Sequence, residues 1–226
     1  MIGILDLQGD VIEHLRHLRH LGLEGVPVKK PEDMDGLLGL ILPGGESTCL
    51  SRLIRQFKLD VAIKRKFNQG MKIFGTCAGA ILLARSITGE KPHLALVDMV
   101  IERNGFGSQL DSFSLQAIIK SVSLHPVPLT FIRAPKIITV GSDVDILLGI
   151  DNYIAAVETT GALATIFHPE LTSDFSFHRY FLRKCGLDAG DTRFQRSAGM
   201  RPGFRGTANA LQGGSTPPPA AIILRR

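Results

Sequence analysis

The sequence predicts an α/β fold of three layers: a mostly parallel β-sheet with helices on both faces and antiparallel strands added to it. In the first half of the 226 residues, short apolar runs alternate with segments of helical periodicity, which is typical of parallel βαβ units. In the second half, apolar runs of strand length follow one another with few helices between them. Antiparallel additions to the sheet are therefore expected there.

The first half contains the expected βαβ units. In the segment 11–21, Leu15, Leu18 and Leu21 recur at helical spacing and predict one apolar face. The apolar runs that precede each turn are short and continuous, as expected of buried strands. The expected strands are 2–7, 26–28, 37–42 and 72–75, and the expected helices are 11–21, 47–57, 61–67 and 78–84.

The second half is expected to consist mainly of strands and to end in a helix. The expected strands are 93–102, 113–119, 129–132, 146–148, 153–159 and 163–167, and the helix is 173–184.

We expect one domain over residues 1–188 and a disordered basic tail over 189–226. The tail is rich in Gly, Pro, Ser and Arg, and such a composition buries too little apolar surface to offset its ordering entropy. Residues 190–226 hold six arginines and one aspartate, which equals the whole net charge of +5. Because residues 1–189 are formally neutral, a large nucleic-acid-binding face is disfavoured.

The sequence also indicates the cellular compartment in which the protein is expected. No apolar run is long enough to cross a bilayer, and the N-terminus lacks the basic start and cleavage site of a signal peptide. The three cysteines form no disulfide framework, so free thiols are expected. These observations predict a cytoplasmic protein.

One cysteine lies in a turn that suits a nucleophile. Gly75-Thr76-Cys77-Ala78-Gly79 follows an apolar strand and precedes an apolar helix, as in a nucleophile elbow. Such a turn exposes the side chain at the strand end beside helix N–H groups, which favour a thiolate and can bind an oxyanion. The alternative is a buried structural cysteine in a glycine-rich turn.

His168 is the candidate base for this thiol. It ends the apolar run 163–167 and is followed by Pro169 and Glu170. Residues i and i+2 of an extended segment point the same way, so Glu170 could hold the imidazole ring. Four other histidines lie on expected helices, and for these a solvated or structural role is favoured over metal binding. They are His14, His17, His20 and His178.

A second glycine turn follows the expected strand 37–42. In Pro43-Gly44-Gly45-Glu46-Ser47, two glycines allow backbone N–H groups to face a ligand. The alternative is a plain strand–helix connection. A phosphate-binding loop is disfavoured because its lysine-containing motif is absent.

With these turns in place, residues 1–186 resemble class I glutamine amidotransferases, and in particular the glutaminase subunits of pyridoxal 5′-phosphate synthase. The resemblance implies a flavodoxin-like sheet. In this sequence Gly105 and Ser108 depart from the pattern usual near the glutamine site. The matching segments are Leu7-Gln8-Gly9, Pro43-Gly44-Gly45-Glu46-Ser47-Thr48, Gly75-Thr76-Cys77-Ala78-Gly79, Glu102-Arg103-Asn104 with Phe106-Gly107, Phe131-Ile132-Arg133-Ala134-Pro135, and Phe167-His168-Pro169-Glu170-Leu171-Thr172.

The resemblance also implies a role for each matching residue. Cys77 would be the nucleophile, His168 the general base and acid, and Glu170 the residue that orients the histidine. The amides of Gly45 and Ala78 would form the oxyanion hole, and Gln8 would lie at the partner interface. Glutamine would be bound by Gly45, Glu46, Ser47, Arg103, Ile132 and Arg133.

The implied reaction is hydrolysis of L-glutamine to glutamate and ammonia, with no metal or organic cofactor. Ammonia would pass to a separate synthase subunit in a hetero-oligomer, with neither nucleic acid nor a membrane as partner. Two alternatives stay open: the glutaminase of another amidotransferase, and a catalytically silent regulatory subunit.

Overall fold

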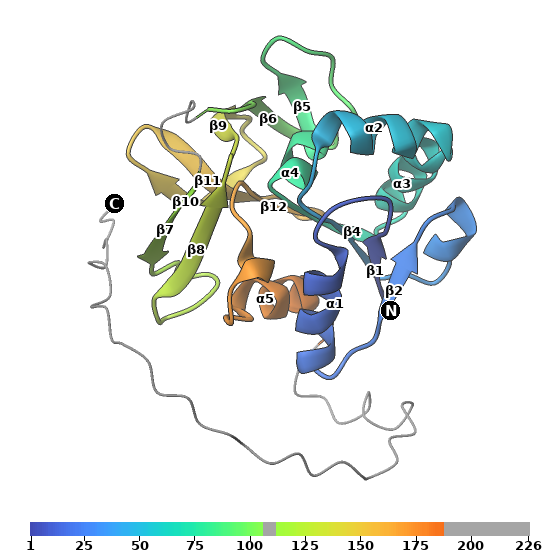
Figure 1. Ribbon diagram of the computed structural model, residues 1–226, viewed down its shortest axis with the longest axis horizontal. Coiled ribbons are helices and arrows are strands. Elements are labelled where there is room, and N and C mark those ends of the chain that lie inside the picture. Colours follow the sequence, from blue (N-terminus) through green and yellow to red (C-terminus); the bar gives the residue numbers. More distant parts are fainter. Residues whose placement is uncertain (106–111, 188–226) are drawn as a thin grey trace.

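The computed structural model describes residues 1–105 and 112–187. They form a ten-stranded mixed sheet and a separate two-stranded hairpin (Figure 1). The strands are β1 (Ile2–Leu5), β2 (Gly25–Val28), β3 (Gly39–Leu42), β4 (Lys72–Thr76), β5 (Ala84–Ile87), β6 (Val97–Glu102), β7 (Ser112–Ala117), β8 (Val127–Ile132), β9 (Lys136–Val140), β10 (Asp145–Ile150), β11 (Tyr153–Glu158) and β12 (Ala162–Thr165). The helices are α1 (Val11–His20), η1 (Pro31–Met34), α2 (Ser47–Gln56), α3 (Leu59–Asn68), α4 (Ala78–Leu83), η2 (Pro169–Leu171) and α5 (Ser176–Lys184).

Five neighbouring strands of the large sheet are parallel. Their order is β2-β1-β3-β4-β12, which is the flavodoxin-like order 2-1-3-4-5 in terms of the parallel strands alone. Every residue of β1, β3 and β12 is buried, because helices cover both faces of this part of the sheet. The predicted α/β class and parallel sheet are confirmed.

Helices lie on the two faces of the parallel strands. In Figure 1, α1 and α5 lie together on one side, and α2, α3 and α4 lie on the other. Aromatic rings fix α5 to the sheet: the Phe181 ring lies 5.5 Å from that of Phe74, and Phe177 meets Phe167 edge-on at 5.1 Å. All four rings are fully buried, so these contacts belong to the main core.

The antiparallel additions lie beyond β12. β11 runs antiparallel to β12, β9 and β10, and β6 runs antiparallel to β9. Two strands, β5 and β9, were not predicted, and residues 93–96 were wrongly included in a strand. The Leu94 and Leu96 amides donate instead to the carbonyls of Leu82 and Leu83 at the end of α4. The tail predicted at 189–226 lies outside the described residues.

The carboxyl ends of the parallel strands meet at one edge of the sheet. Register aligns Thr76 at the end of β4 with Thr165 in β12, and Gly75 with Leu42 in β3. The loops that leave these ends carry the predicted site residues, as expected for an α/β sheet.

None of the helices in the described ranges is long and apolar enough to span a membrane.

Candidate active site

Cys77 sits on a strained turn between β4 and α4. Its backbone has φ 48° and ψ −104°, a conformation that non-glycine residues rarely adopt. The Cys77 amide donates to the Thr165 carbonyl at 2.8 Å, which ties the turn to β12. Gly79 is required because a Cβ there would collide with the carbonyl oxygen of Leu42. The thiol is buried, and its Sγ lies 3.9 Å from the Ile132 carbonyl oxygen.

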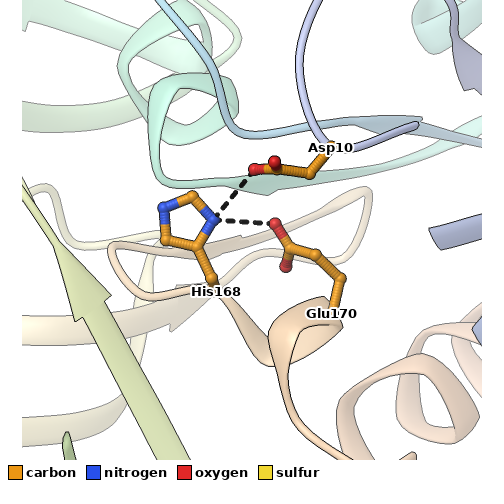
Figure 2. A group of neighbouring side chains, drawn as sticks. All are labelled: Asp10, His168 and Glu170. Carbon is orange, nitrogen blue, oxygen red and sulfur yellow. Dashed lines mark hydrogen bonds and ion pairs between the residues drawn. The ribbon is translucent and has the colours of Figure 1, made fainter. Parts of the chain in front are cut away.

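His168 follows β12 and is held at the same sheet edge. Its amide donates to the Thr130 carbonyl at 2.8 Å. Figure 2 shows two carboxylates facing one ring nitrogen: Nδ1 lies 2.9 Å from Glu170 Oε1 and 3.2 Å from Asp10 Oδ2. Glu170 is only 3% exposed, whereas the Asp10 side chain is 32% exposed. The ring is therefore oriented from one side by a buried acid and a partly exposed one.

These partners determine the charge of the ring. Burial alone lowers the pKa of His168, but hydrogen bonds with Asp10, Cys77 and Glu170 outweigh burial and raise the pKa to about 12. The hydrogen bond from His168 in turn lowers the pKa of Asp10. An imidazolium beside a thiol favours the thiolate, which is the reactive form of cysteine.

The thiol and the imidazole line one cavity of about 440 Å³, a volume typical of small-molecule sites. It brings together every predicted site residue except Glu170, which lies behind His168. Asp10, Ile81, Asn104 and Leu171 also line it and were not predicted. The predicted residues in its wall are Gln8, Gly45, Glu46, Ser47, Cys77, Ala78, Arg103, Ile132, Arg133 and His168.

The turn after β3 passes close to the other site residues. A Cβ on Gly44 would meet the His168 ring and would lie 2.7 Å from Asp10 Oδ2, so only glycine fits. Gly45 has φ +150°, and the next amide, that of Glu46, donates to Gln8 Oε1 at 2.9 Å. The loop after β1 therefore holds the loop after β3.

Two groups on this side of the cavity are available for a ligand. Ser47 Oγ is buried and, among the described residues, has no hydrogen-bond partner. Ala78 is the first residue of α4, so its amide has no acceptor within the helix. A buried donor without an acceptor is unfavourable, and a polar ligand would relieve that cost.

Arg103 is already paired. Its guanidinium lies 3.0 Å from Glu46 Oε1 and 3.0 Å from Glu90 Oε2. Glu46 also accepts hydrogen bonds from the Thr48 and Cys49 amides, so it caps α2. Arg133 is exposed and makes no ion pair with a described residue.

Within residues 1–105 and 112–187, one group could hold a metal ion. Asp10, His168 and Glu170 each offer an atom within 4.8 Å of the others. A hydrogen on His168 Nδ1 shared by two carboxylates accounts for the same geometry.

Asp10 is the residue that sequence reasoning missed at the histidine. Its signal is an acid directly after Leu7-Gln8-Gly9, in the loop that leaves a parallel strand. The segment Phe106-Gly107 and Ser108, named above, lie outside the described residues.

Comparison with known proteins agrees with this site. A model of the SNO glutamine amidotransferase family matches residues 4–187. The subunit PdxT of pyridoxal 5′-phosphate synthase from Syntrophus aciditrophicus is 63% identical over 186 residues, which cover 82% of this chain and 83% of the relative. The same subunit from Clostridium botulinum is 46% identical over 81% of this chain and 96% of the relative.

A solved structure is similar as well. The crystal structure of a glutamine amidotransferase aligns with a TM-score of 0.79 and 40% identity, covering 82% of this chain and 99% of that one. The chain therefore belongs to the SNO glutamine amidotransferase family.

Proposed function

We propose that this chain is the glutaminase subunit of a pyridoxal 5′-phosphate synthase, which makes vitamin B6. It hydrolyses L-glutamine to glutamate and ammonia, and a separate synthase subunit uses the ammonia. The observation that carries the proposal is Cys77 and His168 in one cavity, with the histidine ring held from behind by Glu170. The relatives named above are subunits of that synthase.

In the first half of the reaction, the Cys77 thiolate attacks the side-chain amide carbon of glutamine. The amides of Gly45 and Ala78 bind the oxyanion that develops. His168 then protonates the leaving nitrogen, so the C–N bond breaks and ammonia departs. The products of this half are a thioester on Cys77 and a neutral imidazole.

In the second half, water hydrolyses the thioester. His168 removes a proton from the water, which attacks the carbonyl carbon, and the C–S bond breaks. Glutamate leaves and the thiolate–imidazolium pair is restored. Glu170 keeps the His168 Nδ1 hydrogen in place, so the other ring nitrogen is the one that exchanges protons with the reacting groups.

The glutamine backbone is expected to bind at the polar wall of the cavity. Arg133 suits the α-carboxylate because a guanidinium can engage both oxygens. Ser47 Oγ offers a buried hydroxyl without a described partner. Gly45, Glu46, Arg103 and Ile132 complete the proposed substrate site.

Gln8 is proposed to lie toward the synthase subunit. Its Oε1 accepts from the Glu46 amide, so the loop that carries Gly45 is fixed by a neighbouring loop rather than by a ligand. We expect the oxyanion hole to be completed when the partner docks. We place the complex in the cytoplasm and expect neither nucleic acid nor a membrane as partner, since residues 1–189 are formally neutral.

The test measures glutamate release from glutamine with and without the cognate synthase subunit. We expect activity that rises with the synthase and is lost in Cys77→Ala. The matched control is Cys49→Ser, which alters an exposed thiol on α2 and should keep full activity.

Two outcomes contradict the proposal. Full activity in Cys77→Ala removes Cys77 as the nucleophile. Synthase binding by the wild-type chain without glutamine turnover indicates the silent regulatory subunit instead.

A further inference from the structure

Three buried histidines form a hydrogen-bonded chain behind the catalytic histidine. His14 and His17 lie on α1, and His178 lies on α5; His14 and His178 are fully buried and His17 is 5% exposed. His14 Nδ1 lies 2.8 Å from His178 Nε2, and His17 Nδ1 lies 3.0 Å from His178 Nδ1. We call these three residues the histidine relay.

The relay connects two fixed ends. At one end, His17 Nε2 lies 3.0 Å from the carbonyl oxygen of Thr172. At the other end, His14 Nε2 lies 3.3 Å from Thr76 Oγ1 and 3.6 Å from Glu170 Oε1. Thr76 Oγ1 also lies 3.2 Å from the same Glu170 oxygen, which accepts from His168. Every ring nitrogen of the relay thus has a polar neighbour.

Counting hydrogens assigns a direction to the relay when all three rings are neutral. The Thr172 carbonyl can only accept, so His17 carries its hydrogen on Nε2 and accepts at Nδ1. His178 must then donate from Nδ1 and accept at Nε2, and His14 must donate from Nδ1. His14 Nε2 is left with a lone pair, and the single hydrogen of the Thr76 hydroxyl is shared between this nitrogen at 3.3 Å and Glu170 Oε1 at 3.2 Å, so the hydroxyl links His14 to Glu170.

One added proton reverses this direction. If His17 is protonated, its Nδ1 donates to His178, which must then donate from Nε2 to His14. His14 becomes a donor at Nε2 and presents a hydrogen to Thr76 and Glu170. His17 is the relay ring that lines a second cavity of about 490 Å³, together with Glu13, Arg16, His20 and Glu170, so a proton from this cavity can reach the relay at His17.

We propose that His14 is a positioning residue for Glu170. The hydrogens on His178 and His17 decide whether His14 Nε2 presents a lone pair or a hydrogen to Thr76 and Glu170. The inference deepens the function proposed above and rests on it, since Glu170 holds the ring of the catalytic His168. A carboxylate with fixed neighbours on one side keeps its bond to His168 on the other.

The surroundings favour the neutral form of the relay. Burial lowers the pKa of His14 and His17 and lowers that of His178 well below its usual value. The carboxylates of Glu170, Asp10 and Asp174 oppose this effect, whereas His20 and His168 add to it. Near neutral pH, His14 therefore faces Glu170 with a lone pair.

Two substitutions of His14 distinguish the contact made by Nδ1 from the contact made by Nε2. An asparagine amide reaches the place of Nδ1, so His14→Asn keeps a group for His178 and loses the contact with Thr76 and Glu170. A glutamine amide reaches the place of Nε2, so His14→Gln keeps the contact with Thr76 and Glu170 and loses His178. Each variant loses one of two buried contacts, and both should unfold at similar temperatures.

We expect His14→Asn to lower kcat of the synthase complex roughly tenfold at unchanged KM, and His14→Gln to stay within about threefold of wild type. Equal losses in the two variants would assign His14 a purely structural role and overturn the proposal. If His14→Asn does not fold, Thr76→Val removes the same contact and should reproduce the loss, with Thr76→Ser as the control. Wild-type kcat in Thr76→Val would overturn the proposal as well.

A second measurement does not depend on glutamine turnover. The rate of Cys77 alkylation by iodoacetamide against pH reports the thiolate, and thereby the charge of His168. A Glu170 that is less well held stabilises the imidazolium less, so the half-maximal rate should move to higher pH in His14→Asn and not in His14→Gln. A chain without glutaminase activity would refute the proposed function, while this profile would still decide the role of His14.

Discussion

The two sides of the His168 ring differ in almost every physical respect. On one side is a cavity of about 440 Å³ lined by Cys77 and by Ser47, whose hydroxyl has no hydrogen-bond partner among the described residues. On the other side, Nδ1 faces two carboxylates, and behind the buried one lie the histidine relay and the aromatic core between α5 and the sheet. The cavity side is ready to exchange protons, and the buried side is arranged to hold the ring.

The difference separates binding from orientation. Residues on the cavity side can change partners when a ligand enters. Most polar atoms on the buried side have partners within the described part of the protein, although Glu170 Oε2 has none there, so the geometry of the paired groups changes only if the core does. Each prediction below tests whether one side can be disturbed without the other.

The largest effect is expected for Glu170→Gln. An amide in place of the carboxylate removes the strongest acceptor for His168 Nδ1–H, and the wrong ring tautomer becomes accessible. We expect kcat to fall about 10³- to 10⁴-fold, by analogy with the orienting acid of serine proteases. The measurement is synthase-stimulated glutamate release. A loss of less than tenfold would mean that Asp10 alone orients the ring.

The two sides should also titrate in opposite directions. The relay histidines have lowered pKa values, so their contribution to stability is lost as pH falls below about 6.5, by up to about 1.4 kcal/mol per pH unit for each ring. His168 has its pKa raised to about 12, so its contribution is complete below about pH 6.5 and is lost as pH rises toward 12.

Denaturant unfolding between pH 5 and pH 9 measures the free energy of unfolding on both sides of neutrality. Its decrease toward low pH is the acid limb, and its decrease toward high pH is the alkaline limb. His178→Gln should flatten the acid limb, and His168→Gln should flatten mainly the alkaline limb, with a smaller change in the acid limb because His168 also helps to lower the pKa of His14. If each variant changed both limbs equally, the two sides would not be separate.

A smaller effect is expected for Asp10→Asn. The Asp10 carboxylate lies farther from His168 Nδ1 than the Glu170 carboxylate does, and it is more exposed. We therefore expect kcat/KM to fall roughly tenfold, the equivalent of about 1.4 kcal/mol. The pKa of His168 should fall as well, which moves Cys77 alkylation to higher pH. The control is Asp6→Asn in the same loop, where Asp6 pairs only with Lys29 among the described ion pairs. Equal losses in the two variants would indicate a loop effect.

The smallest effect on activity is expected for Glu158→Gln, because Glu158 does not line the site cavity and its described side-chain contacts on α5 are with residues other than His178. Glu158 accepts from the Tyr180 hydroxyl at 2.6 Å and from Lys184 Nζ at 2.8 Å, which joins α5 to β11. Its loss should lower the free energy of unfolding by about 1–3 kcal/mol and leave kcat unchanged. A large loss of activity would show that α5 transmits strain to the site through its own contacts with the sheet.

The sequence predicted the cavity side better than the buried side. Cys77 and His168 stand directly after apolar strands, and parallel strands end at one edge, so their meeting follows from local pattern and topology. The helical spacing of His14 and His17 was visible, but burial depends on α5 covering that face of α1. His14 and His178 are separated by 164 residues, and no local rule links them.

Similar reasoning explains the errors in the second half. β5 is four residues long with two exposed positions, so neither apolar alternation nor a continuous run marks it. Residues 93–96 have strand-like composition, but their amides find acceptors at the end of α4. Hydrogen-bond partners supplied by another element, β6 for β5 and α4 for residues 94–96, decided both cases.

The glycines under the cavity also bear on redesign of this enzyme for other amides. A side chain at Gly79 would strike the Leu42 backbone, and one at Gly44 would strike the His168 ring. These two positions therefore require glycine, and libraries that randomise them would be filled with inactive members. Ile81, Ile132 and Leu171 line the same space with side chains, so altered substrate range is best sought at those three positions.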